Sequence, residues 1–163
     1  MNRLIHAASA SLILSASLVA AAQSPPPAAP PAPSPAKLAI EARKAVYVLI
    51  GSNFRPIGGL LQGRGQYDAA EFQKRIDRIV FLTDLANESF PEVSNSGLPD
   101  TKAKAGIWSD RADFDKRLKD FQEHAKALAQ VNAKEKGVTE AFKSAAGTLA
   151  QDCKGCHDKY REK

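Results

Sequence analysis

Apolar side chains recur at steps of three and four residues along most of the chain, which is the spacing of an amphipathic helix. This spacing predicts four helices: one over 37–62, one over 69–88, a third from Ser109 or Asp110 to a stop at Gly137, and a fourth from Thr139 onward. Asp68 and Glu71 form a capping box before the second helix, and residues 92–106, rich in Ser, Asn, Gly, Pro and Asp, form the longest loop. No segment alternates as a strand does. The chain is therefore expected to fold as an all-α, up-down-up-down four-helix bundle.

The inward face of each helix follows from the same spacing. In the third and fourth helices it includes Phe121, Leu128 and Leu149, which we expect to share one core. The fourth helix continues its stripe through Cys153 and Cys156, so both cysteines are predicted to face inward.

The N-terminal part of the chain has a different composition. Residues 1–22 begin with a short basic start, continue with an apolar run diluted by serines and end in three alanines, the pattern of a cleaved secretory signal peptide. The apolar run falls short of the ~20 residues that a membrane span needs, so we expect export to the periplasm without a membrane anchor. Residues 23–36, dominated by Pro and Ala, are predicted to form an extended linker, which leaves 37–163 as the folded domain.

The overall charge is mildly basic. The sequence has 23 Lys and Arg against 18 Asp and Glu, a formal net charge of +5, of which Arg3 is lost with the signal peptide. Lys and Arg do not form runs interleaved with aromatic residues, so nucleic-acid binding is not indicated. Acidic redox partner proteins, or solubility alone, explain the balance better.

Candidate chemistry is concentrated at the C-terminal end. Cys153 and Cys156 are the only cysteines, His157 follows them directly, and the three fall within about one turn of the fourth helix. The pattern C-x-x-C-H is the attachment motif of c-type haem, in which the thiols add to the haem vinyl groups and the histidine binds the iron. We therefore predict one haem c per chain, covalently attached through Cys153 and Cys156, with His157 as the metal ligand.

Three other interpretations of the cysteines compete with haem attachment. A disulfide would close a very short loop inside a helix. A thioredoxin-like redox pair belongs at a helix N-terminus that follows a strand. A zinc site would need a fourth ligand, for which His124 is the only histidine left. Each fits the sequence less well than haem does.

The sixth position of the iron has two candidate ligands to consider. Met1 is the only methionine and leaves with the signal peptide, so methionine ligation is excluded. His124 would give a bis-histidine site, but it lies off the centre of the third helix's apolar stripe, where a boundary histidine is the commoner case. We expect the sixth position to be empty or weakly occupied.

A four-helix bundle that ends in CKGCHDKYR resembles the cytochromes c-prime, and the similarity runs from about Leu38 to Arg161. Beyond the haem motif it rests on Arg43 with Phe54, Phe90-Pro91, Thr101-Lys102-Ala103, Ile107-Trp108-Ser109, and Arg161 four residues after His157. Ala105 departs from the family pattern, in which a proline commonly precedes the Ile-Trp pair. The departure concerns the shape of this loop only.

The resemblance implies a five-coordinate, high-spin haem with a crowded distal side, and a homodimer packed through the first two helices. It places Tyr47 over the distal side of the iron and Arg161 near the proximal face. Trp108 is expected either against the haem edge or as a cap on the core.

Arg43 lies on an apolar stripe, where a guanidinium is costly to bury without a partner. A haem propionate is a suitable partner. Lys44 and Lys102 are further candidates at the propionates.

The sequence thus predicts a periplasmic haem protein that binds small gaseous ligands, chiefly nitric oxide and carbon monoxide. An electron carrier with a six-coordinate haem is the alternative. An enzyme, such as a nitric oxide reductase or a weak peroxidase, is a third class, but the sequence offers no distal acid–base pair of the kind that peroxide cleavage needs.

Overall fold

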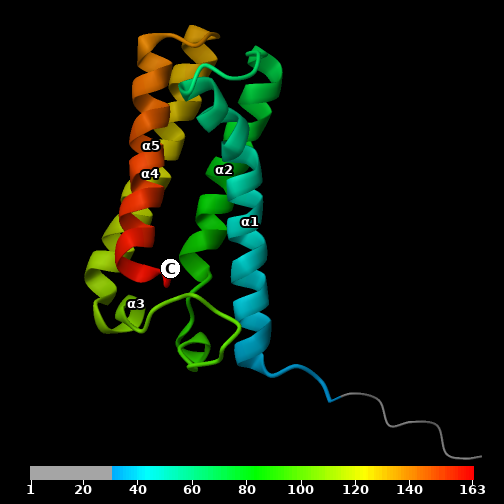
Figure 1. Cartoon of the computed structure of the whole chain (residues 1–163), viewed down its shortest axis with the longest axis vertical. Helices are drawn as coiled ribbons and strands as arrows, with labels where there is room; N and C mark the ends of the chain where they lie inside the picture. The colour runs from blue at the N-terminus through cyan, green and yellow to red at the C-terminus, as the bar shows by residue number, and fades with distance from the viewer. Residues whose placement is uncertain (1–30) are drawn as a thin grey trace, which may run out of the picture. The chain divides into compact units, whose positions relative to one another are not determined.

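The computed structural model describes residues 31–163. The helices in this part of the chain are α1 Pro35–Leu61, α2 Ala69–Glu88, the 3-10 helix η1 Glu92–Ser94, α3 Gly106–Ser109, α4 Arg111–Glu135 and α5 Glu140–Tyr160. The long helices α1, α2, α4 and α5 run alternately up and down (Figure 1), as the sequence predicts. The signal peptide predicted for 1–22 and most of the linker predicted for 23–36 lie outside the described residues.

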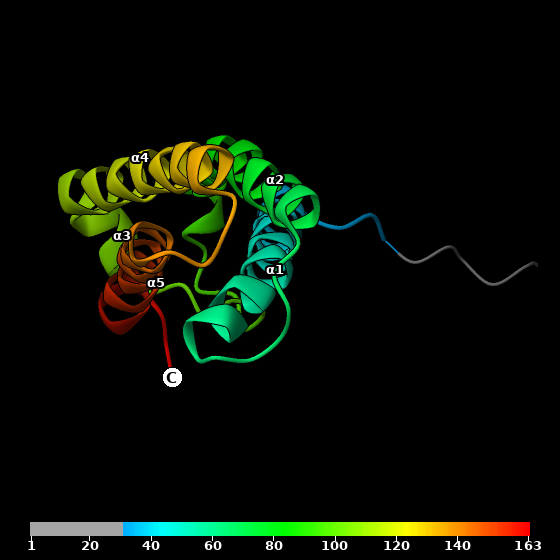
Figure 2. The same cartoon turned by 90° about the horizontal axis from the view of Figure 1, so that it is seen from above.

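The four long helices pack unevenly around the interior. α1 packs on α2, α2 on α4 and α4 on α5, whereas α1 and α5, the first and last helices, pack against each other less extensively than these three pairs do. In the view from above, the ribbons of α1 and α5 stand apart from each other (Figure 2). A bundle that is looser along one side can hold a ligand between its helices.

The first helix begins two residues inside the predicted linker. Ser34 is its N-cap, and the Ser34 side chain accepts a hydrogen bond from the Lys37 N–H at 3.2 Å. Pro35 occupies the first turn, where its fixed φ and missing N–H favour a helix start. Pro56 lies inside α1 without ending it, and the helix continues to Leu61.

Two helix ends differ in detail from the prediction. Asp68 caps α2 as expected, its carboxylate accepting the Glu71 N–H at 2.7 Å, but the Glu71 carboxylate pairs with Arg75 at 2.7 Å. The reciprocal half of the predicted capping box is therefore wrong. α4 ends at Glu135 rather than at Gly137, because the residue that takes the left-handed conformation is Lys136, with φ 49°.

The start of α4 also differs from the prediction. The short helix α3 precedes it and was not expected, and Asp110 is the N-cap of α4 without a side-chain capping bond. The Asp110 carboxylate instead binds Lys159 at 2.7 Å. Thr139 caps α5 as predicted, accepting the Phe142 N–H at 3.2 Å.

The core is built by apolar residues from all four long helices. Phe121, Leu128 and Leu149 are buried in it together, which confirms the predicted helix phases. A second, smaller core lies where α3, α4 and the end of α5 meet, and it contains Phe90, Ile107, Phe114, Leu118 and Tyr160. In the described part of the chain, none of the helices combines the length and the apolar character that a membrane crossing requires.

Candidate haem site

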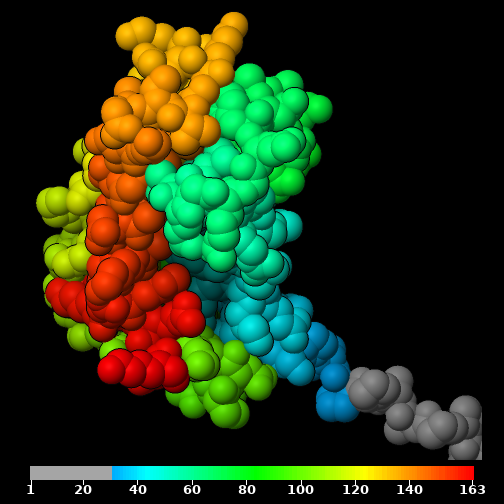
Figure 3. Space-filling model, turned by 45° about the horizontal axis from the view of Figure 1, so that its top comes forward, coloured from blue at the N-terminus to red at the C-terminus, as the bar shows by residue number. Residues whose placement is uncertain are grey.

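A cavity of about 570 Å³ opens beside α1 and α5, at the looser side of the bundle. The space-filling view shows the surface hollowed between the red end of α5 and α1 (Figure 3). Its wall is largely apolar and includes Ile50, Phe54, Phe90, Ile107, Phe114, Leu118 and Phe121. A cavity of this size and character is typical of sites for cofactors and small ligands.

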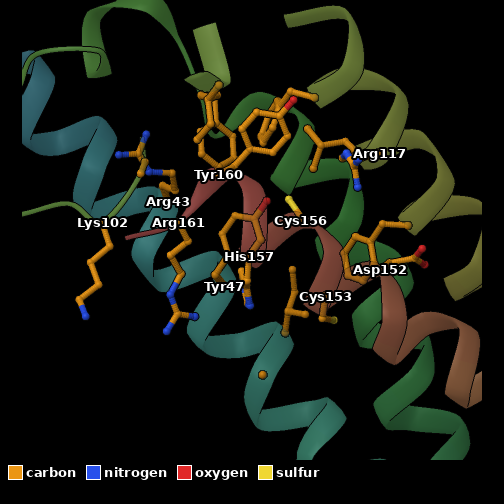
Figure 4. Close-up of a pocket in the computed structure, with 18 of the residues that line it drawn as sticks. Arg43, Tyr47, Lys102, Arg117, Asp152, Cys153, Cys156, His157, Tyr160 and Arg161 are labelled. Atoms are coloured by element: carbon orange, nitrogen blue, oxygen red, sulfur yellow. The ribbon is translucent and has the colours of Figure 1, made fainter. Parts of the chain in front are cut away.

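The three residues of the C-x-x-C-H motif line this cavity from α5 (Figure 4). Cys153 and Cys156 are half-buried free thiols. Burial raises the pKa of Cys153 to about 11 and raises that of Cys156 as well. Burial, with a smaller contribution from Arg161, lowers the pKa of His157. At neutral pH the site therefore presents two protonated thiols and a neutral imidazole, the form in which histidine binds a metal.

These properties disfavour the competing interpretations of the cysteines. Reactive redox thiols have a lowered pKa, whereas burial raises the pKa of both thiols here. Within residues 31–163, no group of three or more His, Cys, Asp and Glu side chains is arranged to hold a metal ion, which argues against zinc.

His124 is not placed to bind the iron. It does not line the cavity, its side chain is 40% exposed, and its Nδ1 lies 2.8 Å from Oδ2 of Asp152. His157 is the only histidine among the described residues that line the cavity. The structure thus favours the boundary role of His124 over a bis-histidine site.

The α1 wall of the cavity carries Tyr47. Its ring lies edge-on to that of Phe90, with centroids 5.9 Å apart. Burial raises the pKa of Tyr47, and the nearby Cys156 and Cys153 thiols raise it further, so the hydroxyl stays neutral. Tyr47 from α1 and the C-x-x-C-H residues from α5 project into the same space (Figure 4).

Arg43 is the buried charge of the cavity wall. It is only 4% exposed, and its guanidinium donates to Ser94 Oγ at 3.0 Å and to Thr101 Oγ1 at 2.8 Å. The guanidinium also lies over the Phe90 ring, 4.9 Å from its centroid. Among residues 31–163 it has no carboxylate partner. Among the described residues, only neutral hydroxyls accept hydrogen bonds from the Arg43 guanidinium. Its positive charge therefore remains uncompensated in the cavity wall.

The other cationic residues expected at the haem lie at the edge of the cavity. Lys44, Lys102 and Arg161 all line it and are exposed. An isolated bridge pairs Ala103 with Arg161, so the chain end lies beside the 102–104 loop. The Lys102 ammonium donates to the Lys163 carbonyl at 3.2 Å.

Trp108 occupies a different place from these residues. It is absent from the cavity wall and packs against Phe90 with ring centroids 6.3 Å apart. The structure therefore supports the second of its two expected roles, as a cap on the core. The Trp108 indole N–H is buried without a hydrogen-bond partner among the described residues.

A cluster around Asp113 was missed by the sequence analysis. Its carboxylate accepts hydrogen bonds from Tyr160 Oη at 2.6 Å, Arg117 Nε at 2.7 Å and Lys159 Nζ at 2.9 Å. Arg117 and Tyr160 also line the cavity. The cluster ties the last turn of α5, which follows His157, to the start of α4. Only the i, i+4 spacing of Asp113 and Arg117 could have signalled it from the sequence.

The chain matches a known protein family over most of its length. The family model described as Cytochrome C' matches residues 38–161. The chain belongs to the cytochrome c' family. Cytochrome c' of Rubrivivax gelatinosus is 33% identical over 126 residues, covering 77% of this chain and 95% of that protein.

Solved structures of the family have the same fold. The cytochrome c prime structure from Shewanella frigidimarina has a TM-score of 0.72 and 38% identity, and the match covers 78% of this chain and 97% of that one. A carbon monoxide-bound variant from Alcaligenes xylosoxidans has a TM-score of 0.67 and 28% identity, with 77% and 94% covered. A nitric oxide complex of another mutant of that protein has a TM-score of 0.69 and 27% identity, with 78% and 96% covered.

Membership of the cytochrome c' family makes this chain a non-enzymatic haem protein with one covalent haem c, and Cys153 and Cys156 are its pair of cysteines. Proteins of this family are typically periplasmic. The residues of the cavity fit the group: two thiols and an imidazole on one helix, a largely apolar wall, and the buried Arg43 charge, which has no carboxylate partner among residues 31–163.

Proposed function

We propose that this cytochrome c' binds nitric oxide and carbon monoxide at a haem iron that is held by His157 and left open on its other side. Relatives with the same fold have been solved with each gas bound. The observation that carries the proposal is the asymmetry of the cavity. His157 on α5 is the one histidine of the described cavity wall, and Tyr47, with a neutral hydroxyl, stands on the α1 wall.

The residues of the haem motif and Tyr47 have separate parts in this function. Haem iron supplies the ligand-binding and redox chemistry when the group is held. Cys153 and Cys156 hold the group covalently, and His157, kept neutral by burial, has a free lone pair for the metal. Tyr47 excludes water and large ligands from the opposite side.

Cationic residues anchor the polar edge of the group. The buried Arg43 guanidinium has N–H donors beyond the two that Ser94 and Thr101 accept, so it can bind a propionate as well. Lys44 and Lys102 add positive charge at the same edge, and Arg161 adds it beside His157.

The same edge favours electron exchange with acidic partner proteins as a second role. Lys44, Lys102 and Arg161 are exposed around the cavity, and complementary charge speeds the encounter of redox partners. This role is compatible with gas binding.

A homodimer packed through α1 and α2 and a periplasmic location complete the proposal. Large apolar side chains away from the cavity are exposed on these two helices, namely Leu38 and Leu49 on α1 and Phe81 and Leu85 on α2. Apolar surface of this kind is typical of an interface between subunits. The periplasmic location rests on the signal peptide expected in residues 1–22.

Titration of the reduced holoprotein with nitric oxide and with carbon monoxide tests the proposal. We expect each gas to change the visible spectrum with an end point of one ligand per chain. The variant His124→Ala should titrate in the same way, because His124 pairs with Asp152 and does not itself line the cavity. A reduced protein that bound neither gas until His124 was removed would contradict the proposal.

A further inference from the structure

Gly51 interrupts the row of side chains that α1 presents to the cavity. Tyr47, Gly51 and Phe54 follow one another at steps of four and three on one helix face, and all three line the cavity. Two aromatic rings therefore flank a position that has no side chain.

The usual reasons for a glycine do not apply at this position. Gly51 lies in the interior of the 27-residue helix α1, where glycine costs about 1 kcal/mol relative to alanine. Its φ is not positive. A Cβ built on Gly51 would meet no atom within 4 Å, whereas one built on Gly58 would meet Phe54 Cε1 at 3.7 Å. Neither backbone conformation nor close packing requires glycine here, so the space beside it is open.

The open space lies at the border between the cavity and the solvent. Gly51 itself is exposed, and Val48, its neighbour one turn earlier, is 68% exposed and also lines the cavity. On the inner side of the same face, Ile50 is buried. A gap at this border connects the outside with the α1 wall where Tyr47 stands.

We propose that the gap at Gly51, between Tyr47 and Phe54, is the entry path for diatomic ligands, and that the missing side chain sets the size of ligand that can pass. The inference rests on the proposed function, since it assumes that a gas binds on the Tyr47 side. It makes Gly51 a determinant of ligand access, distinct from Tyr47, which covers the bound position itself.

The test is the replacement of Gly51 by leucine in the reduced holoprotein. Gly51→Leu should lower the association rate of carbon monoxide by about fivefold or more, because the ligand must wait for side chains to move. The dissociation rate should fall by the same factor, and the dissociation constant should stay unchanged, because a group that contacts neither end state cannot alter the equilibrium. The visible spectrum should remain that of the wild type.

The matched control is Gly147→Leu. Gly147 also lies inside a long helix, α5, and a Cβ there would also meet nothing within 4 Å, but Gly147 does not line the cavity. Its leucine variant should bind carbon monoxide at the wild-type rates. Gly51→Ala and Gly147→Ala should both raise the melting temperature, since alanine favours the helix and no contact is lost.

Several results would overturn the inference. Wild-type association in Gly51→Leu would show that the gas enters elsewhere. Weaker affinity with an altered spectrum, or a lower melting temperature in Gly51→Ala, would show that Gly51 makes room for the haem itself. If the wild type binds carbon monoxide and Gly51→Leu has no effect on the rates, the entry path alone is refuted. If the wild type binds no carbon monoxide, both the path and the proposed function are overturned.

Discussion

Replacement of Tyr47 by alanine should make the protein bind carbon monoxide faster. A ring that covers the ligand side of the site must move before a diatomic molecule can bind, and this movement breaks the edge-on contact with Phe90 at 5.9 Å. Such contacts are worth ~0.5–1.5 kcal/mol, and the ring also loses apolar burial when it moves. A barrier of about 1.4 kcal/mol corresponds to a tenfold change in rate. We therefore expect Tyr47→Ala to raise the association rate about tenfold.

The assay is flash photolysis or stopped-flow mixing of the reduced holoprotein with carbon monoxide. Tyr47→Phe is the matched control, because it keeps the ring and removes only a hydroxyl that burial holds neutral. Its rate should stay within about twofold of the wild type, a barrier change below ~0.5 kcal/mol.

Two results would refute this account of Tyr47. An unchanged rate in Tyr47→Ala would mean that the ring does not limit access. A large increase in His124→Ala, with none in Tyr47→Ala, would mean that His124 occupies the sixth position and that the protein is a six-coordinate carrier.

Three further predictions concern stability and assembly. Leu149→Ala, at a fully buried core position, should lower the free energy of unfolding in urea by about 2–5 kcal/mol, and a loss well below this range would contradict the tight packing of Leu149 in the core. Hydrogen bonds from Tyr160, Arg117 and Lys159 hold the pKa of Asp113 below its ordinary value of 3.8. The ionised Asp113 carboxylate therefore stabilises the fold above pH 3.8, and this contribution to the free energy of unfolding is lost as the pH falls below that value. The urea midpoint of the wild type should therefore fall more steeply between about pH 5 and pH 2 than that of Asp113→Asn, and parallel curves would contradict the role of this cluster. Phe81→Glu, on the exposed apolar face of α2, should convert dimers to monomers in analytical ultracentrifugation, while Val93→Glu, outside α1 and α2, should not.

The sequence sufficed for the bundle because long amphipathic helices carry a strong periodic signal. Helices α2 and α5 begin where the caps Asp68 and Thr139 place them. The errors lie at helix ends: the Glu71 carboxylate pairs with Arg75, Lys136 in front of Gly137 is left-handed, and α3 forms a separate turn. Helix ends are the parts of a helix that periodicity defines least sharply.

The site residues could be predicted where the position of each residue follows from the helix that contains it. The C-x-x-C-H residues, Tyr47 and Arg43 line one cavity as the sequence and the family resemblance imply. The hydroxyl partners of Arg43 lie more than 50 positions further along the chain, and periodicity contains no information about them.

The same limit applies to the Asp113 cluster, to the choice between the two expected roles of Trp108 and to the gap at Gly51. Each depends on how separate helices and loops meet. Such contacts follow from the fold, and no single segment of the chain encodes them.

The central claim is that the haem of this cytochrome c' has one strong protein ligand and a free position behind Tyr47. The most direct measurement is the visible and resonance Raman spectrum of the reduced holoprotein, recorded before and after exposure to carbon monoxide. The account predicts a high-spin, five-coordinate iron that converts fully to a low-spin complex when the gas is added. A low-spin, six-coordinate spectrum that carbon monoxide left unchanged would contradict it.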